Sequence, residues 1–228
     1  MRIHMPPREM NGAPHPRHQV RRVAEGSSGT ARTSQDDIER LRSALNTLYT
    51  SGWYHGAMTY KDAKKKLRET DNGTFLIRDS SDANYLFALS VKTPRGTTSV
   101  RIEYDQGKFS LDSDDAIKSN VPSFDCVVGL INHYIELSKA EEAKSIDSNG
   151  NKESKKRRKG SGQFVWLEPS GRKDTEAAIK KPLRSDVPSL QHLCRCTINS
   201  QLKEQGKILT LDLPGKLKSY LMDYPFDQ

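Results

Sequence analysis

Long apolar runs are missing from this sequence of 228 residues. The longest, residues 127–131 around Gly129, is far short of the roughly 20 residues that a membrane-spanning helix needs, so we expect no stable membrane insertion. Residues 1–20 lack the apolar centre of a secretory signal, because prolines interrupt them.

Cysteine is also scarce. Three cysteines are an odd, sparse set that predicts no disulfide framework and favours a reducing compartment, which we take to be the cytoplasm.

The net charge of +8 comes from two stretches of the chain. Residues 1–34 carry a net +4 and residues 139–184 a net +6, whereas residues 35–138 carry −2 and residues 185–228 are neutral. Both basic stretches look unfolded, so we expect a disordered tail over 1–34 and a basic linker or insertion over 139–184. Charge in such segments does not form a basic face of a fold, which disfavours nucleic-acid binding. The run at 155–159 (KKRRK) leaves open a nuclear signal or contact with anionic lipid.

The apolar residues between these stretches predict an α+β domain. Ile38, Leu41, Leu45 and Leu48 are spaced by 3, 4 and 3 residues, which predicts one amphipathic helix over 36–50. A second helix is expected after Thr59 and a third from Phe124. Four strands are expected between these two helices, at residues 74–78, 85–91, 98–104 and 108–111. This order predicts a central antiparallel sheet flanked by two helices over residues 53–138.

Arg78 is the most informative single residue, because it ends an otherwise apolar strand. An arginine in a strand usually points to water or pairs with a carboxylate, for which Asp79 is the nearest candidate. The loop that follows offers the hydroxyls of Ser80 and Ser81 and several backbone amides, which suit an anion. Arg101, in the third strand, supplies a second guanidinium. Two guanidinium groups with hydroxyls and amides fit a dianionic phosphate.

The C-terminal residues predict short helices that need a partner surface, either from the same chain or from another. Leu190, Cys194 and Ile198 are four residues apart and share one helix face. A further apolar stripe follows at residues 217–224, but some forty residues in short helices cannot bury much core alone. A metal site from His192, Cys194 and Cys196 is a weaker alternative, because two of these residues diverge on a helix and no fourth ligand is near.

Two motifs, in order, resemble the SH2 domain, which binds phosphotyrosine. They are residues 52–56 (GWYHG) and residues 73–81 (GTFLIRDSS). The resemblance implies that Arg78 is the primary phosphate ligand, that Ser80 and Ser81 belong to the phosphate-binding loop, and that Arg101 lies beside the phosphotyrosine. One departure is Tyr60, which stands where many SH2 domains have a second phosphate-binding arginine.

The C-terminal part resembles a SOCS box. Residues 189–198 (SLQHLCRCTI) are similar to the helix that binds elongin C, which implies contacts from Leu190, Cys194 and Ile198. Residues 211–214 (LDLP) are similar to the cullin-5 box, which implies contacts from Leu211, Leu213 and Pro214. Here Asp212 replaces the first proline of that motif.

An SH2 domain followed by a SOCS box, over residues 185–228, is typical of the suppressor of cytokine signalling family, and the tail at 224–226 (YPF) resembles its CIS-type branch. The helix at 36–50 stands where that family has an extended segment that packs on the SH2 domain. The resemblance implies a cytoplasmic, non-catalytic substrate receptor without a cofactor. Its partners would be tyrosine-phosphorylated cytokine receptors or signalling proteins, elongin B/C, and cullin-5 with its RING partner. The alternative is a phosphotyrosine adaptor that blocks receptor docking sites without ubiquitin ligase activity.

Overall fold

The computed structural model describes residues 2–4, 30–113, 118–144, 165–167, 178–202 and 206–227. The helices are α1 (Thr30–Ser51), α2 (Tyr60–Lys66), the 3-10 helix η1 (Lys118–Asn120), α3 (Val127–Lys144), α4 (Leu190–Leu202), α5 (Gly206–Thr210) and α6 (Gly215–Met222). The strands are β1 (Arg2–His4), β2 (Thr74–Asp79), β3 (Phe87–Thr93), β4 (Gly96–Asp105), β5 (Lys108–Leu111), β6 (Val165–Leu167) and β7 (Lys181–Pro182). Among the described helices, none is both long and apolar enough to cross a bilayer.

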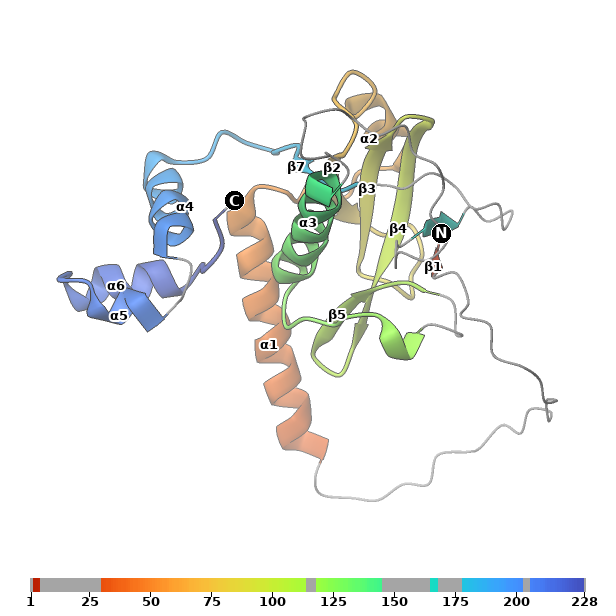
Figure 1. The fold of residues 1–228 in the computed structure, drawn as a ribbon. Helices are drawn as coiled ribbons and strands as arrows, with labels where there is room; N and C mark the ends of the chain where they lie inside the picture. The colour runs from red at the N-terminus through yellow and green to blue at the C-terminus, as the bar shows by residue number, and fades with distance from the viewer. Residues whose placement is uncertain are drawn as a thin grey trace.

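The main sheet has the strand order β5-β4-β3-β2-β7. Its neighbours are antiparallel except for β7, which runs parallel to β2. Helices α1 and α3 lie on one side of this sheet (Figure 1), where Leu48 and Ile131 join Phe75 and Ile77 in one fully buried core. The other face is covered by α2, where Leu76 packs on Ala63 and Leu67. The predicted α+β fold, an antiparallel sheet flanked by helices, is therefore confirmed.

The side-chain period of β2 decides which face Arg78 occupies. Successive residues of a strand point to opposite faces. Phe75 and Ile77 lie in the larger core, so Leu76 and Arg78 point to the face that α2 covers. The sequence of β2 thus places a guanidinium under α2, at the end of a completely buried apolar run.

The structure differs from the expected boundaries at both ends of the predicted linker. Helix α3 continues to Lys144, and Ile179 is buried in the larger core. Strand β7 then pairs with the start of β2, and the Leu183 amide donates to the Phe75 carbonyl at 2.7 Å. The basic run at 155–159 lies outside the described residues.

The structure also differs from the expected N-terminal tail and from the expected start of β3. Helix α1 begins at Thr30, six residues before the predicted start, and β1 pairs with β6, so these parts of residues 1–34 are regular. The rest of that predicted tail lies outside the described residues. Strand β3 begins at Phe87 rather than at residue 85, because residues 82–85 form a turn in which the Tyr85 amide donates to the Asp82 carbonyl.

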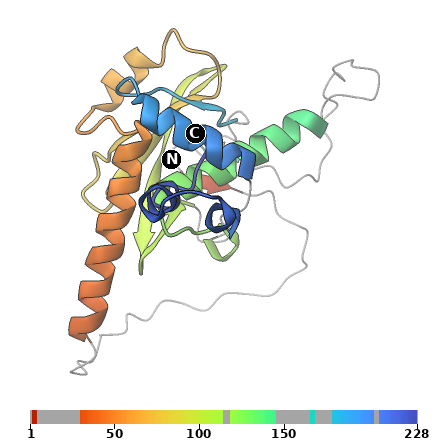
Figure 2. The same cartoon turned by 90° about the vertical axis from the view of Figure 1, so that its left-hand side faces the viewer.

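The three C-terminal helices α4, α5 and α6 lie beside α1 and α3, on the side remote from the sheet (Figures 1 and 2). The chain returns from α6 toward α3, where the Phe226 ring lies about 3.7 Å from the position that a Cβ on Gly129 would take. Cys196 and Tyr224 belong to the same buried core as the sheet residues. The C-terminal helices therefore share a core with the sheet domain instead of folding apart from it.

Candidate functional site

Arg78 is a buried cation near the end of β2. Its exposed fraction is 4%. Its Nε donates to Ser90 Oγ at 3.2 Å, and its Nη1 donates to the Asp79 carbonyl at 2.9 Å. Among the described residues it forms no ion pair. Burial lowers the pKa of this guanidinium, although arginine stays charged in proteins. A buried charge without a counter-ion is costly, so the site favours an incoming anion.

The Asp79 carboxylate forms no ion pair with Arg78, although its charge opposes the lowering of the pKa of Arg78. The Asp79 carboxylate accepts a hydrogen bond from the Tyr54 hydroxyl, and burial together with this bond raises the pKa of Tyr54. Arg78 meets the carbonyl of Asp79 and not its carboxylate. The alternative of an Arg78–Asp79 ion pair is therefore contradicted by the structure, because adjacent strand residues point to opposite faces.

The loop after β2 begins with Ser80, two residues after Arg78 along the chain. The Ser80 hydroxyl accepts from the Asp82 amide at 3.1 Å, which leaves the hydroxyl proton available to a ligand. Ser81 is exposed. The loop is stabilised by Asp82 Oδ1, which accepts from the Asn84 amide and from Asn84 Nδ2.

Strand register brings Arg101 into the same row as Arg78. Ala88 of β3 pairs with Arg78 on one side and with Arg101 on the other, and directly opposite residues of paired strands share a face. The small side chain of Ala88 leaves room between the two arginines. Arg101 is not free, however. It forms ion pairs with Asp82 at 3.2 Å and with Asp112 at 3.6 Å, and it lies 5.1 Å from the centre of the Tyr85 ring.

Tyr60 stands at the start of α2, at the position where many SH2 domains have a second phosphate-binding arginine. Its hydroxyl donates to the Thr97 carbonyl at 2.9 Å, and its electrostatic interaction with Arg78 opposes the lowering of the arginine's pKa. The wall formed by α2 thus presents a phenol and not a third guanidinium.

Several neighbours of this pocket are not among the residues predicted from the sequence: Ser90, Ala88, Asp82, Asp112 and Tyr85. Ser90 orients Arg78 and bonds Ser99 Oγ at 2.7 Å. These positions follow from strand register and loop geometry, and no local motif in the sequence marks them. The structure places Arg78, Ser80 and Arg101 on the β2–β3–β4 part of the sheet and its adjoining loop.

The second candidate site is an exposed stripe on α4. Leu190 is 77% exposed and Ile198 is 37% exposed, and Cys194 between them is exposed as well. The opposite face of α4 is buried, with His192, Cys196 and Asn199 directed inward. A row of solvent-facing apolar side chains on a helix that already has a packed face is typical of a partner-binding surface.

The inward face of α4 is structural. His192 Nδ1 lies 3.0 Å from Arg195 Nη2, and Asn199 Nδ2 donates to the Tyr224 carbonyl at 2.7 Å. Burial and the nearby arginines lower the pKa of His192. Cys196 Sγ is 3.6 Å from His192 Nε2, whereas Cys194 faces solvent on the other side. The described residues contain no group of three side chains placed to hold a metal ion.

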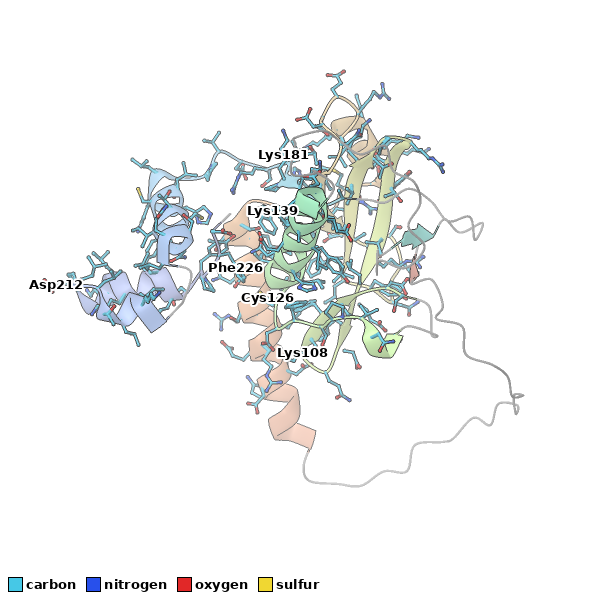
Figure 3. All side chains as sticks on the ribbon, in the orientation of Figure 1. Lys108, Cys126, Lys139, Lys181, Asp212 and Phe226 are labelled. Atoms are coloured by element: carbon cyan, nitrogen blue, oxygen red, sulfur yellow. The ribbon has the colours of Figure 1, made fainter. Side chains whose placement is uncertain are left out.

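Residues 211–214 connect α5 to α6. Leu211 and Leu213 are half-buried, while Asp212 and Pro214 are exposed, and Pro214 directly precedes the first residue of α6. Figure 3 labels Asp212 at the end of the C-terminal helices that is farthest from the sheet. This segment and the exposed stripe on α4 are both open to a partner.

Comparisons with known proteins assign both parts of the chain to known families. A model of the SH2 domain family matches residues 53–134, and a model of the SOCS box family matches residues 186–222. Suppressor of cytokine signaling 2 from Homo sapiens is 43% identical over 202 residues, which are 88% of this chain and 89% of the relative. The cytokine-inducible SH2-containing protein of Gallus gallus is 38% identical over 89% of this chain and 77% of its own. Suppressor of cytokine signaling 3 from Homo sapiens is 36% identical over 84% of this chain and 87% of its own.

Proposed function

Because this chain belongs to the suppressor of cytokine signalling family, with an SH2 domain and a SOCS box, we propose that it is a phosphotyrosine-binding substrate receptor of a cullin–RING ubiquitin ligase. It acts in the cytoplasm on activated cytokine receptors or associated signalling proteins. Its SH2 domain captures the phosphorylated tyrosine, and its SOCS box recruits the ligase. The result is negative regulation of cytokine signalling, including the JAK-STAT pathway.

The observation that carries the phosphotyrosine assignment is the burial of Arg78, which forms no ion pair with any described carboxylate. Two of its five N–H groups are used by Ser90 and by the Asp79 carbonyl, so three remain for a ligand. Ser80 adds a hydroxyl donor, and Arg101 lies in the same row of the sheet. We assign Arg78 as the main phosphate ligand, with Ser80 and Ser81 in the binding loop and Arg101 beside the phosphotyrosine.

The ligase assignment depends on the exposed faces of the C-terminal helices. We assign Leu190, Cys194 and Ile198 to elongin C, which brings elongin B with it. We assign Leu211, Leu213 and Pro214 to cullin-5, whose RING partner supplies the ubiquitin-transferring machinery. In this proposal catalysis belongs to the partners, and the chain contributes recognition.

A phosphotyrosine adaptor without ligase activity is the second candidate. It is favoured by one observation, the charged and exposed Asp212 in the cullin segment, where the motif has a proline. In this case binding of the receptor would block docking sites, and elongin would bind without productive cullin recruitment.

Two measurements on the full chain co-expressed with elongin B/C test the proposal. The first is titration with tyrosine-phosphorylated peptides from receptor tails and with their unmodified versions, for which we expect binding only with phosphate. The second is titration with purified cullin-5 and its RING partner. Cullin binding supports the ligase receptor, whereas phosphate-dependent binding without cullin binding supports the adaptor. Equal affinity for phosphorylated and unmodified peptides would contradict both.

A further inference from the structure

The guanidinium of Arg101 is shared by two carboxylates. Its Nη2 lies 3.2 Å from Asp82 Oδ2, and its Nη1 lies 3.6 Å from Asp112 Oδ2. Each of the two terminal nitrogens therefore faces one carboxylate. Arg78, across Ala88 in the same row, has no such partner among the described residues. Of the two arginines in the pocket, only Arg101 is already engaged by described carboxylates before a phosphate binds.

The two carboxylates differ in how firmly they are held. Asp112 follows β5, is only 4% exposed, and its amide donates to the Arg101 carbonyl at 2.9 Å. Backbone pairing therefore fixes Asp112 beside Arg101. Asp82 comes from the loop between β2 and β3, and its side chain is 30% exposed. Movement of this loop can separate Asp82 from Arg101 while the sheet stays intact.

The Asp82 side chain occupies a position that suits one oxygen of a phosphate. Its Oδ2 meets Arg101, and its amide donates to the hydroxyl of Ser80, which is itself in the assigned phosphate-binding loop. A dianionic phosphate that approached Arg101 while Asp82 remained would face two carboxylates around one guanidinium. Like charges at such distances repel each other, so the phosphate gains Arg101 only if Asp82 leaves.

We propose that Asp82 is a built-in competitor for Arg101, so that phosphotyrosine binds by exchanging the Asp82 carboxylate for a phosphate oxygen. This inference rests on the proposed phosphotyrosine binding and adds a residue that sets its affinity. Arg78 supplies the contact that is available before binding, and Arg101 supplies a second contact that has to be released. Asp82 lowers the affinity for every phosphate ligand of the pocket.

The test is calorimetric titration of the full chain, bound to elongin B/C, with free phosphotyrosine. Asp82→Asn removes the charge but keeps a carbonyl oxygen that can accept from Asn84. Exposed ion pairs contribute up to about 1 kcal/mol, so we expect the dissociation constant to fall about two- to fivefold. The matched control is Asp105→Asn, which makes the same charge change at the far end of β4. It lies four positions from Arg101 along β4, or about 13 Å, which exceeds the screening length of about 8 Å at physiological salt.

A second pair of variants tests whether the effect acts through Arg101. In an Arg101→Gln background, Asp82→Asn should no longer tighten binding, because the contact that Asp82 blocks is gone. The same gain in that background would overturn the exchange and indicate direct repulsion of the phosphate. Unchanged or weaker binding by Asp82→Asn alone would also overturn it, since Asp82 would then orient Arg101 for the ligand. If the wild-type chain binds no phosphotyrosine, the proposed function fails as well, which separates that outcome from the others.

Discussion

Replacing Arg78 by lysine tests the phosphate pocket while keeping its positive charge. Lysine cannot form the planar pair of hydrogen bonds that a guanidinium makes with phosphate. It also loses the bond from Nε to Ser90, which holds the arginine in place at 3.2 Å. A hydrogen bond to a charged group contributes about 1.5–3 kcal/mol. A lysine ammonium also has three N–H groups, but they radiate from one nitrogen and cannot reproduce the two parallel hydrogen bonds of a guanidinium.

We therefore expect Arg78→Lys to weaken phosphopeptide binding by at least about 2 kcal/mol, which is about 30-fold in the dissociation constant. The assay is calorimetric titration of the elongin-bound chain with one phosphotyrosyl peptide. Arg68→Lys, the same change at an exposed arginine near the C-terminal end of α2, is the matched control and should leave affinity unchanged. Coincident thermal unfolding of both variants would show that the fold is kept. Affinity of Arg78→Lys within threefold of wild type would refute the assignment.

Three further predictions concern the partner surface and the packing. Replacing Leu190 and Ile198 together by serine should abolish co-purification with elongin B/C but leave phosphotyrosine binding intact, because both side chains are exposed on one face of α4. The control is Ile38→Ser, which changes an exposed apolar residue of α1. If elongin still co-purified with the double variant, the stripe would be misassigned. Tyr224→Ala should lower the free energy of unfolding by about 3–5 kcal/mol in a denaturant titration, since Tyr224 is 1% exposed in the core that the C-terminal helices share with the sheet; a loss below about 1 kcal/mol would argue against that shared core. Gly73→Ala should lower the free energy of unfolding by at least about 1 kcal/mol, because Gly73 has a φ of +89° and the Cβ of the alanine would lie 2.5 Å from Lys180 Cγ. An unchanged free energy of unfolding would contradict the packing of residues 178–183 on the sheet.

The sheet and the main helices could be predicted from local pattern alone. Alternation and turn residues located β2, β3, β4 and β5 to within two residues at each end, because these strands are long or bounded by turn residues such as glycine. Strand β7 could not be predicted in this way. It has two residues, one of them proline, and its partner β2 lies about a hundred residues away in the sequence. A charged stretch with little apolar content gave no local sign of Ile179 entering the core.

The main residue of the phosphate pocket, Arg78, could be predicted from the sequence. The ion pairs that occupy the second arginine, Arg101, could not. Arg78 is marked by its place at the end of an apolar strand, and burial of that strand fixes its environment. Arg101 is marked only as a basic residue in the third strand. Whether it is free depends on Asp82 and Asp112, which reach it through loop geometry and strand register. Such long-range pairs leave no periodic signal in a single sequence.

For the C-terminal helices, too, one feature could be predicted from the sequence and another could not. The stripe of Leu190, Cys194 and Ile198 follows from helical spacing, and the structure leaves all three side chains accessible. The contribution of Tyr224 to the core of the sheet domain was not visible, because it depends on the chain returning to α3 after α6.

The most direct test of the central claim is ubiquitin transfer in a reconstituted system. It contains the full chain, elongin B/C, cullin-5 with its RING partner, and a substrate that carries one receptor-derived tyrosine in phosphorylated or unphosphorylated form. We expect ubiquitin on the phosphorylated substrate only, with the signal lost in Arg78→Lys and in the Leu190→Ser, Ile198→Ser variant. Equal modification of both substrates, or none despite tight phosphopeptide binding, would contradict the proposal of a phosphotyrosine-dependent ligase receptor.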